Sequence, residues 1–163
     1  MIKLIWAEAH NHVIADKGDI PWKLPADQQF FKQLTLNHPI VFGRNTLLSF
    51  RGRPLPKRTN IVLSHDTKLE VPAGFTLMHS IEEVMAFAKA QNDDLYVIGG
   101  KGIYQSFMPY ADELIVTEID ADISGDTQMD AIDLDTWQVV NRVVGTVDEK
   151  NIYPHIFKTY QRK

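Results

Sequence analysis

Residues 95–110 read LYVIGGKGIYQSFMPY and contain, in order, a predicted strand, a glycine turn and a predicted helix. The apolar run over 95–100 is typical of a buried strand. The helical pattern over 101–110 ends at Pro109, because proline cannot continue a helix. A strand that ends in glycine and passes directly into a helix is typical of a parallel sheet covered by helices.

Similar apolar runs occur along the rest of the chain and alternate with helical patterns. They predict strands over 2–8, 39–43, 59–64 and 113–119, and helices over 25–36 and 80–91. Ser80 and Glu83 form a capping-box pair at the start of the last helix. Residues 136–144 and 153–163 alternate without a helix between them, which predicts antiparallel strands. We therefore expect an α/β fold: a central, mostly parallel sheet with an antiparallel C-terminal edge and helices on both faces.

The composition limits the class of protein. A length of 163 residues suits a single domain over 1–163. The net charge of −4 disfavours a general nucleic-acid binder. The absence of cysteine excludes disulfides, thiolate zinc sites and thiol nucleophiles. No apolar run approaches the ~20 residues of a membrane span, and the N-terminus does not resemble a signal peptide, so a cytoplasmic protein without a membrane partner is predicted.

A long connection over residues 9–24, AHNHVIADKGDIPWKL, contains no predicted element. Most connections have about 4–6 residues, and longer ones are often lids or binding loops. Gly18 and Pro21 would shape such a loop. It is either a tolerated insertion or a lid, and the lid is favoured because the loop leads directly into the helix that carries Asp27.

Two glycine turns, VFGRNT at 41–46 and IGGKGIY at 98–104, connect a predicted strand to a helix. Free N–H groups at a helix start attract anions, and glycine allows the ligand to approach the backbone closely. Arg44 and Lys101 add positive charge. Two such turns on one sheet indicate a dinucleotide diphosphate. Neither matches the G-x-G-x-x-G or P-loop pattern, so tight packing of helix on strand is the alternative interpretation.

Asp27 shares a helical face with Phe30, Phe31 and Leu34. An unpaired charge in such surroundings is costly, and we expect burial to raise the pKa of this carboxyl. One interpretation is favourable interaction with the helix dipole in the first turn. The other is a partner for a planar, amidine-like ring, held by two parallel hydrogen bonds. The aromatic neighbours and Trp22 in the adjacent loop favour the second.

Three other constellations do not support a function. The tripeptide His10-Asn11-His12 has no further ligand at a telling spacing, so we interpret these as solvated loop histidines, and no metal site is predicted. Residues 120–125 imitate the start of an EF-hand loop, but Ala131 occupies the position of its last glutamate. No G-x-S-x-G motif indicates a serine nucleophile.

Six motifs carry a resemblance to a known family: VIADKGDIPWKLPAD (13–27), VFGRNTLLSF (41–50), GRPLPKRTNIVLS (52–64), VIGGKGIY (97–104), LIVTEID (114–120) and SGDT (124–127). In this order and spacing the chain resembles the dihydrofolate reductase family, along nearly its whole length. The resemblance implies eight strands, an adenosine-binding subdomain at about 38–92, a monomer, and a mobile active-site loop contacted by Asp126.

The resemblance also implies a reaction: NADPH-dependent reduction of 7,8-dihydrofolate to 5,6,7,8-tetrahydrofolate, by hydride transfer to C6 and protonation of N5. Asp27 would hold the pterin, Thr117 would brace that carboxylate, and Trp22 would hold a water. Arg58 would pair with the glutamate carboxylate of folate. The implied substrate-binding residues are Ile5, Ala7, Asp27, Gln28, Phe31, Phe50, Arg53, Leu55, Arg58 and Thr117. Antifolates would be inhibitors, diaminopyrimidines in particular, since their protonated ring matches the carboxylate.

For NADPH, the resemblance implies a cis bond between Gly99 and Gly100, and a pocket for the 2′-phosphate at Arg44, Ser64 and His65. The implied cofactor-binding residues are Ala7, Ile14, Ala15, Asp19, Ile20, Gly43, Arg44, Asn45, Thr46, Ser64, His65, Ile98, Gly99, Gly100, Lys101, Gly102, Ile103 and Tyr104.

Four residues depart from the family pattern: Ala15 replaces a usual glycine, Leu47 a frequent aromatic, Gln28 an often apolar residue, and Asn45 a cation found in some relatives. None removes a chemical role. Two alternative functions stay open here, the related riboflavin-pathway reductase and a non-catalytic NADPH- or pterin-binding module. Asp27 after P-W-x-L-P and Arg58 in R-P-L-P-x-R argue against the first, and the set of Asp27, Trp22 and Thr117 argues against the second.

Overall fold

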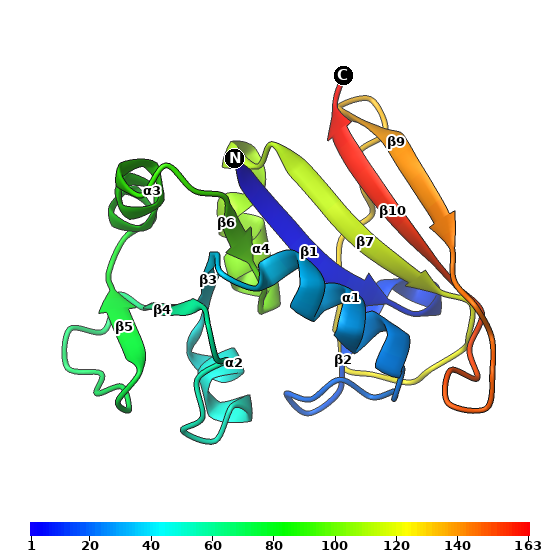
Figure 1. The fold of residues 1–163 in the computed structure, drawn as a ribbon, viewed down its shortest axis with the longest axis horizontal. Helices are drawn as coiled ribbons and strands as arrows, with labels where there is room; N and C mark the ends of the chain where they lie inside the picture. Colours follow the sequence, from blue (N-terminus) through cyan, green and yellow to red (C-terminus); the bar gives the residue numbers. More distant parts are fainter. The chain divides into compact units, whose positions relative to one another are not determined.

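The computed structural model describes all residues, 1–163, and contains an eight-stranded sheet with strand order β5-β4-β3-β6-β1-β7-β10-β9 (Figure 1). The strands are β1 (Ile2–Glu8), β3 (Pro39–Phe42), β4 (Thr59–Leu63), β5 (Phe75–Met78), β6 (Leu95–Val97), β7 (Glu113–Ile119), β9 (Trp137–Val144) and β10 (His155–Arg162). A second, two-stranded sheet consists of β2 (Val13–Ala15) and β8 (Thr127–Gln128). The helices are α1 (Pro25–Thr35), α2 (Arg44–Ser49), α3 (Ile81–Ala90) and α4 (Lys101–Phe107), with 3₁₀ turns η1 (His10–His12) and η2 (Met108–Tyr110). None of the helices combines the length and apolar character needed to cross a membrane.

The chain divides into two compact units, and the first combines residues 1–4 with 35–111. Its strands β4, β3, β6 and the start of β1 pair in parallel, as does β5 with β4. The side chains of β3 are all buried, because a parallel strand covered on both faces has no solvent side. Phe42 packs edge-on against both Phe50 and Phe75, which fixes α2 and β5 against this core.

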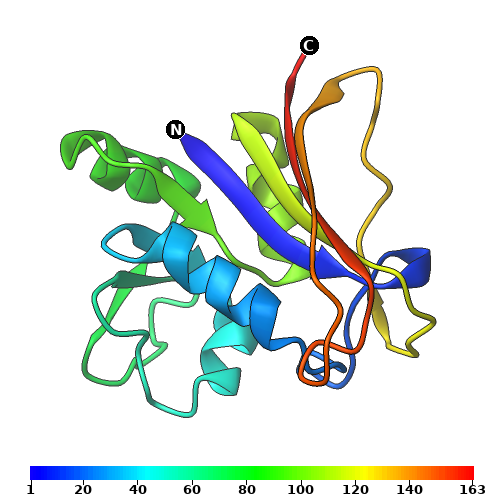
Figure 2. The same cartoon turned by 45° about the vertical axis from the view of Figure 1, so that its right-hand side comes forward.

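The second unit combines residues 5–34 with 112–163. Here β10 pairs antiparallel with β7 on one side and with β9 on the other. Figures 1 and 2 show β9 and β10, in orange and red, side by side along their length. The antiparallel C-terminal edge, the mostly parallel sheet and the α/β class are thus confirmed.

The elements that the sequence pattern missed are short. β5 has four residues and β2 and β8 only three and two, so none shows a clear period-2 pattern. The connection over 9–24 was expected to contain no element, and this is wrong, since η1 and β2 lie within it. The capping at α3 is confirmed in part: Ser80 accepts from the Glu83 amide, but the Glu83 carboxylate accepts from the amide of His79.

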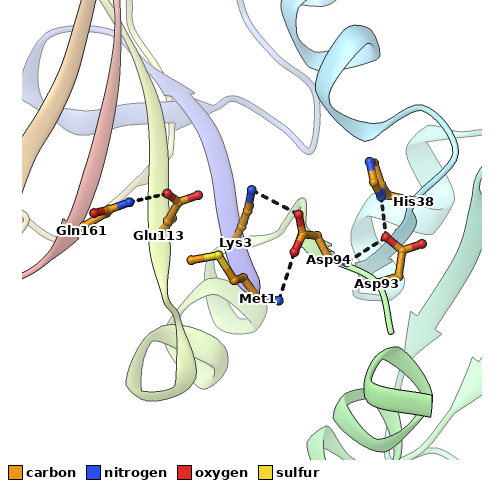
Figure 3. A network of polar contacts seen from close by, with 7 residues as sticks. All are labelled: Met1, Lys3, His38, Asp93, Asp94, Glu113 and Gln161. Carbon is orange, nitrogen blue, oxygen red and sulfur yellow. Dashed lines mark hydrogen bonds and ion pairs between the residues drawn. The ribbon is translucent and has the colours of Figure 1, made fainter. Parts of the chain in front are cut away.

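A small network of charges fixes the N-terminus in the first unit (Figure 3). Asp94 accepts from the terminal amine at 3.0 Å and pairs with Lys3 at 3.2 Å. Partial burial opposes the charge of this carboxylate, but its bonds to the terminal amine and Lys3 outweigh burial and hold the pKa of Asp94 below its ordinary value. Figure 3 also shows the bond from His38 to Asp93 in this unit and, in the second unit, the bond from Gln161 to Glu113.

We expect Asp94→Asn to lower the free energy of unfolding at neutral pH by about 0.5–1 kcal/mol, since the ion pairs are partly exposed. Because the folded pKa lies below the unfolded one, this contribution is present above the unfolded value and is lost as the pH falls through the folded value. Urea unfolding at neutral and acidic pH measures it. Glu70→Gln is the control, because Glu70 forms no ion pair. An equal effect of Asp94→Asn at both pH values would contradict this account.

Candidate active site

The second unit contains a half-buried carboxylate that is hydrogen-bonded by a buried hydroxyl. Thr117 of β7, only 2% exposed, donates from Oγ1 to Oδ1 of Asp27 in the first turn of α1, at 2.6 Å. Burial raises the pKa of Asp27 above its ordinary value, and the Thr117 bond and the charge of His155 oppose this only in part. A carboxyl whose pKa is raised by burial, with a hydroxyl on one oxygen, is a candidate for a functional group.

The position of α1 is set by contacts with the C-terminal strands and their loop. The free amide of Ala26, at the helix start, donates to the side chain of Asn151 at 2.7 Å. Phe30 packs against Phe157 in a tilted arrangement with ring centroids 4.3 Å apart, and Phe157 lies opposite Thr117 in the β10–β7 register. The same strand pair thus supports the helix and supplies the hydroxyl that contacts its carboxylate.

The buried imidazole of His155 was not predicted from the sequence. Its Nδ1 lies 2.8 Å from the carbonyl of Tyr153, and a carbonyl only accepts, so Nδ1 carries a proton. Nε2 is buried without a partner. Gly145 packs directly against this nitrogen, because a Cβ on Gly145 would lie only 2.0 Å from it. A histidine in a strand of alternating pattern has no local feature that separates it from a surface residue.

The connection over residues 9–24 is held by the segment that follows β7. The amide of Lys17 donates to Asp126 at 3.0 Å, which is the loop contact expected for Asp126. His10 lies 2.7 Å from both Asp120 and Asp122, and His12 pairs with Glu8. Both histidines are exposed, as expected for solvated loop histidines, but each also pairs with a carboxylate. The partners of His10 are more than 100 residues away in sequence, so local sequence cannot reveal them, whereas Glu8 lies only four residues before His12.

The remaining predicted residues of this unit differ in exposure. Ile5 is buried, and Trp22, Ala7 and Phe31 are half-buried, as walls of a ligand site would be. Ile14 and Ala15 are half-buried, whereas Gln28, Asp19 and Ile20 are exposed.

The first unit brings the two predicted glycine turns together. Gly43 precedes α2, Gly100 precedes α4, and the Gly43 amide donates to the Gly99 carbonyl at 2.9 Å. A Cβ on Gly43 would lie 2.9 Å from the Ile103 side chain, and Gly99 has φ +125° and a cis bond to Gly100. The close Ile103 contact at Gly43 and the positive φ of Gly99 therefore favour glycine at both turns.

A cavity of about 580 Å³ opens at these turns. Its wall includes the predicted residues Gly43, Arg44, Asn45, Ser64, His65, Gly100, Lys101, Gly102 and Ile103. Thr46, Ile98, Gly99 and Tyr104 do not line it, and Leu63, Ser80, Ile81, Glu82 and Ser106 line it without having been predicted. Leu63 belongs to β4, Ser80, Ile81 and Glu82 lie at the start of α3, and Ser106 lies in α4. The place of β4 and α3 beside the turns follows from sheet order rather than from local sequence.

Arg58 is oriented by two contacts that sequence reasoning missed. Its Nη1 donates to Oγ1 of the fully buried Thr35 at 3.1 Å, and its Nε donates to the Pro56 carbonyl at 3.0 Å. Partial burial lowers the pKa of Arg58, which stays positively charged. An arginine held in this way presents its remaining N–H groups to an anion with little loss of entropy.

The buried amide of Asn60 holds the backbone on either side of this arginine. It accepts from the Leu55 amide and donates to the carbonyls of Leu55 and Arg58, all at 2.9 Å. Phe50 is half-buried, and Arg53 is exposed. The predicted residues Phe50, Leu55 and Arg58 thus belong to one stiffened segment.

Comparisons with known proteins agree with this arrangement. A family model described as dihydrofolate reductase matches residues 1–162. The dihydrofolate reductase of Bacillus subtilis (strain 168) is 38% identical over 163 residues, which cover 100% of this chain and 95% of the relative. That of Enterococcus faecium is 36% identical over 158 residues, covering 97% and 95%. A solved structure of dihydrofolate reductase from Enterococcus faecalis, complexed with NADP(H) and RAB-propyl, has a TM-score of 0.95 at 39% identity and covers 100% of this chain and 96% of that one.

The role of the Thr117 hydroxyl can be measured directly. We expect Thr117→Val to raise the pKa of Asp27 further, because it removes the bond that favours the ionised form. Titration of the Asp27 side-chain carbon by NMR gives this value. Thr117→Ser keeps a hydroxyl and is the matched control, so an equal rise in both variants would contradict the assignment.

Proposed function

Because this chain belongs to the dihydrofolate reductase family, we propose that it reduces 7,8-dihydrofolate to 5,6,7,8-tetrahydrofolate with NADPH as the cofactor. The observation that carries this proposal is the half-buried Asp27 carboxylate with Thr117 on one oxygen. The match over 1–162 supports the whole reaction rather than one motif.

The Asp27 carboxylate is proposed to accept hydrogen bonds from the 2-amino group and N3 of the pterin. Thr117 occupies one lone pair of Oδ1, so the carboxylate keeps enough acceptor capacity for two parallel N–H donors. Two bonds to one carboxylate fix the plane of the ring as well as its position. Ile5, Ala7 and Phe31 are proposed as apolar walls, since they are buried or half-buried in the same unit.

The raised pKa of Asp27 suits the protonation step. When bound, NADPH supplies the hydride that reduces C6. N5 must then gain a proton, which we assign to a water held by Trp22, with Asp27 as the group that sets the local electrostatics. A carboxyl whose pKa lies above its ordinary value is better matched to proton transfer near neutral pH than an exposed one.

The cavity at Gly43 and Gly100 has the properties that the cofactor requires. Backbone amides at two turns without side chains can approach a diphosphate closely. Arg44 and Lys101 supply positive charge in its wall, and Arg44, Ser64 and His65 are proposed to bind the 2′-phosphate. The other predicted cofactor residues, including Ala7, stay proposals of the same kind.

The orientation of Arg58 fits an extended carboxylate ligand. We assign it to the glutamate tail of the substrate, with Arg53 nearby and with Phe50 and Leu55 along the benzoyl group. The single-domain organisation with an adenosine-binding subdomain at about 38–92, the monomeric state, the cytoplasmic location and the binding of antifolates stay predictions.

The decisive experiment follows the loss of nicotinamide absorbance when protein, NADPH and dihydrofolate are mixed. Turnover supports the proposal. Binding of both ligands without turnover would select a non-catalytic module, and turnover only with a phosphoribosyl pyrimidine would select the riboflavin-pathway reductase.

Asp27→Asn should fold normally but lose most of its activity at neutral pH, by about 10²-fold or more. The amide keeps the shape of the side chain but cannot carry the negative charge. Activity should recover in part at acidic pH, where the substrate is already protonated. Asp135→Asn, an exposed position, is the control. Unchanged turnover of Asp27→Asn at neutral pH would remove Asp27 from the mechanism.

Thr35→Val should raise KM for dihydrofolate about tenfold with little change in kcat, because it removes a hydrogen bond that orients Arg58 for binding only. Thr35→Ser keeps the hydroxyl and should behave as the parent. A dihydropterin without the glutamate tail should show no difference among the three proteins. A matching rise in KM for that truncated substrate would show that the variant acts through the fold instead.

A further inference from the structure

The second unit contains a cavity of about 780 Å³ that the proposed reaction does not use. Its wall comes from residues 8–12, 118–120, 131–134, 142–147 and 154–160. Side chains alternate between the two faces of a strand. Thr117 and Phe157 face Asp27, whereas Glu118 and Ile156, opposite each other in the register, line this cavity on the other face.

The acidic side chains in the cavity wall are already paired. Glu8 accepts from the indole of Trp6 and pairs with His12. Glu118 pairs with Lys158 at 2.7 Å, and Asp120 pairs with His10. Each carboxylate of the cavity wall therefore already has a hydrogen-bond or ion-pair partner within the protein.

The positive charges are not balanced in the same way. Arg142 of β9 lies directly opposite Lys158 of β10, and like charges opposite each other are destabilising. Lys158 has Glu118 as its partner, but the side chain of Arg142, which lines the cavity, forms no ion pair or hydrogen bond. An anion beside Arg142 would relieve this repulsion.

A second polar group in the wall also lacks a partner. Tyr160 is only 5% exposed, and its hydroxyl forms no hydrogen bond. Burial and the nearby charges of Glu118 and Glu8 raise the pKa of Tyr160 to about 12, so the hydroxyl remains a donor at neutral pH. The hydroxyl itself is not enclosed by the protein, so a ligand oxygen can reach it and accept its proton in a hydrogen bond.

Around these groups the cavity is apolar. Leu134, Val144 and Val147 are each more than half exposed, and together with Ile132 and Ile156 they line the same cavity. Large apolar side chains gathered in a hollow with a few polar groups are typical of a small-molecule site.

We propose that this cavity binds a small amphipathic carboxylate. The carboxylate pairs with Arg142 and accepts from the Tyr160 hydroxyl, and the apolar part covers Leu134, Val144 and Val147. The site is separate from the pterin and cofactor sites, and its existence does not depend on the proposed reaction.

The test uses NMR titration of the protein saturated with NADP⁺ and methotrexate, so that the proposed catalytic sites are blocked. Octanoate is the probe, and octylamine is the probe of opposite charge. We expect saturable shifts of the Val144 and Leu134 signals with octanoate and much weaker binding of octylamine.

Three variants define the contacts. Arg142→Gln should weaken octanoate binding about tenfold, and Tyr160→Phe should weaken it less, because a charge-assisted bond is the stronger one. Arg51→Gln, which changes an exposed arginine of the other unit, should leave it unchanged. No saturable shift at the cavity, equal binding of octylamine, or full affinity in Arg142→Gln would each overturn the proposal.

Discussion

The hydrogen bond from Thr117 to Asp27 is the interaction on which the proposed chemistry depends. A carboxylate in apolar surroundings is unfavourable, and a single neutral donor does not offset the cost in full. The pKa of Asp27 therefore stays raised, and its remaining lone pairs stay available. A second internal donor would stabilise the fold but would remove the acceptor that the substrate needs.

In the first unit, the groups left available for a ligand are backbone amides. Gly43 and Gly99 leave space where any side chain would collide or be strained, and the bond between them holds the two turns in place. The amides at the helix starts are thus left for a ligand instead of being covered by the protein's own side chains. In both units the binding groups are incompletely satisfied by the fold itself.

Local sequence was sufficient to propose residues for the chemistry but not to predict the contacts that orient them. Asp27 could be selected because a charge on the helical face of Phe30 and Phe31 contradicts the pattern. The long strands were identifiable because buried parallel strands are continuous apolar runs. Thr35 and His155 were missed, since the residues they contact, Arg58 and Gly145, lie in other segments of the chain. Asn60 was missed because its bonds to nearby backbone groups form only when the loop before β4 has folded. The short β2, β5 and β8 were missed because two to four residues show no period.

The hydrogen bonds that hold residues 5–34 in place show why the orienting contacts cannot be predicted from local sequence. Ala26 bonds to Asn151, Lys17 to Asp126, and Asp27 to Thr117, so each anchor comes from the C-terminal part of the same unit. His10 adds a further anchor of a particular kind. Both of its ring nitrogens face carboxylates, which only accept, so the bridge to Asp120 and Asp122 requires an imidazolium. The bonds to Asp122 and Asp120 raise the pKa of His10, and the bridge is therefore strongest below that raised value and weakens as the imidazole loses its proton. The start of the active-site loop is thus held by charge, whereas the helix that follows it is held by packing and neutral hydrogen bonds.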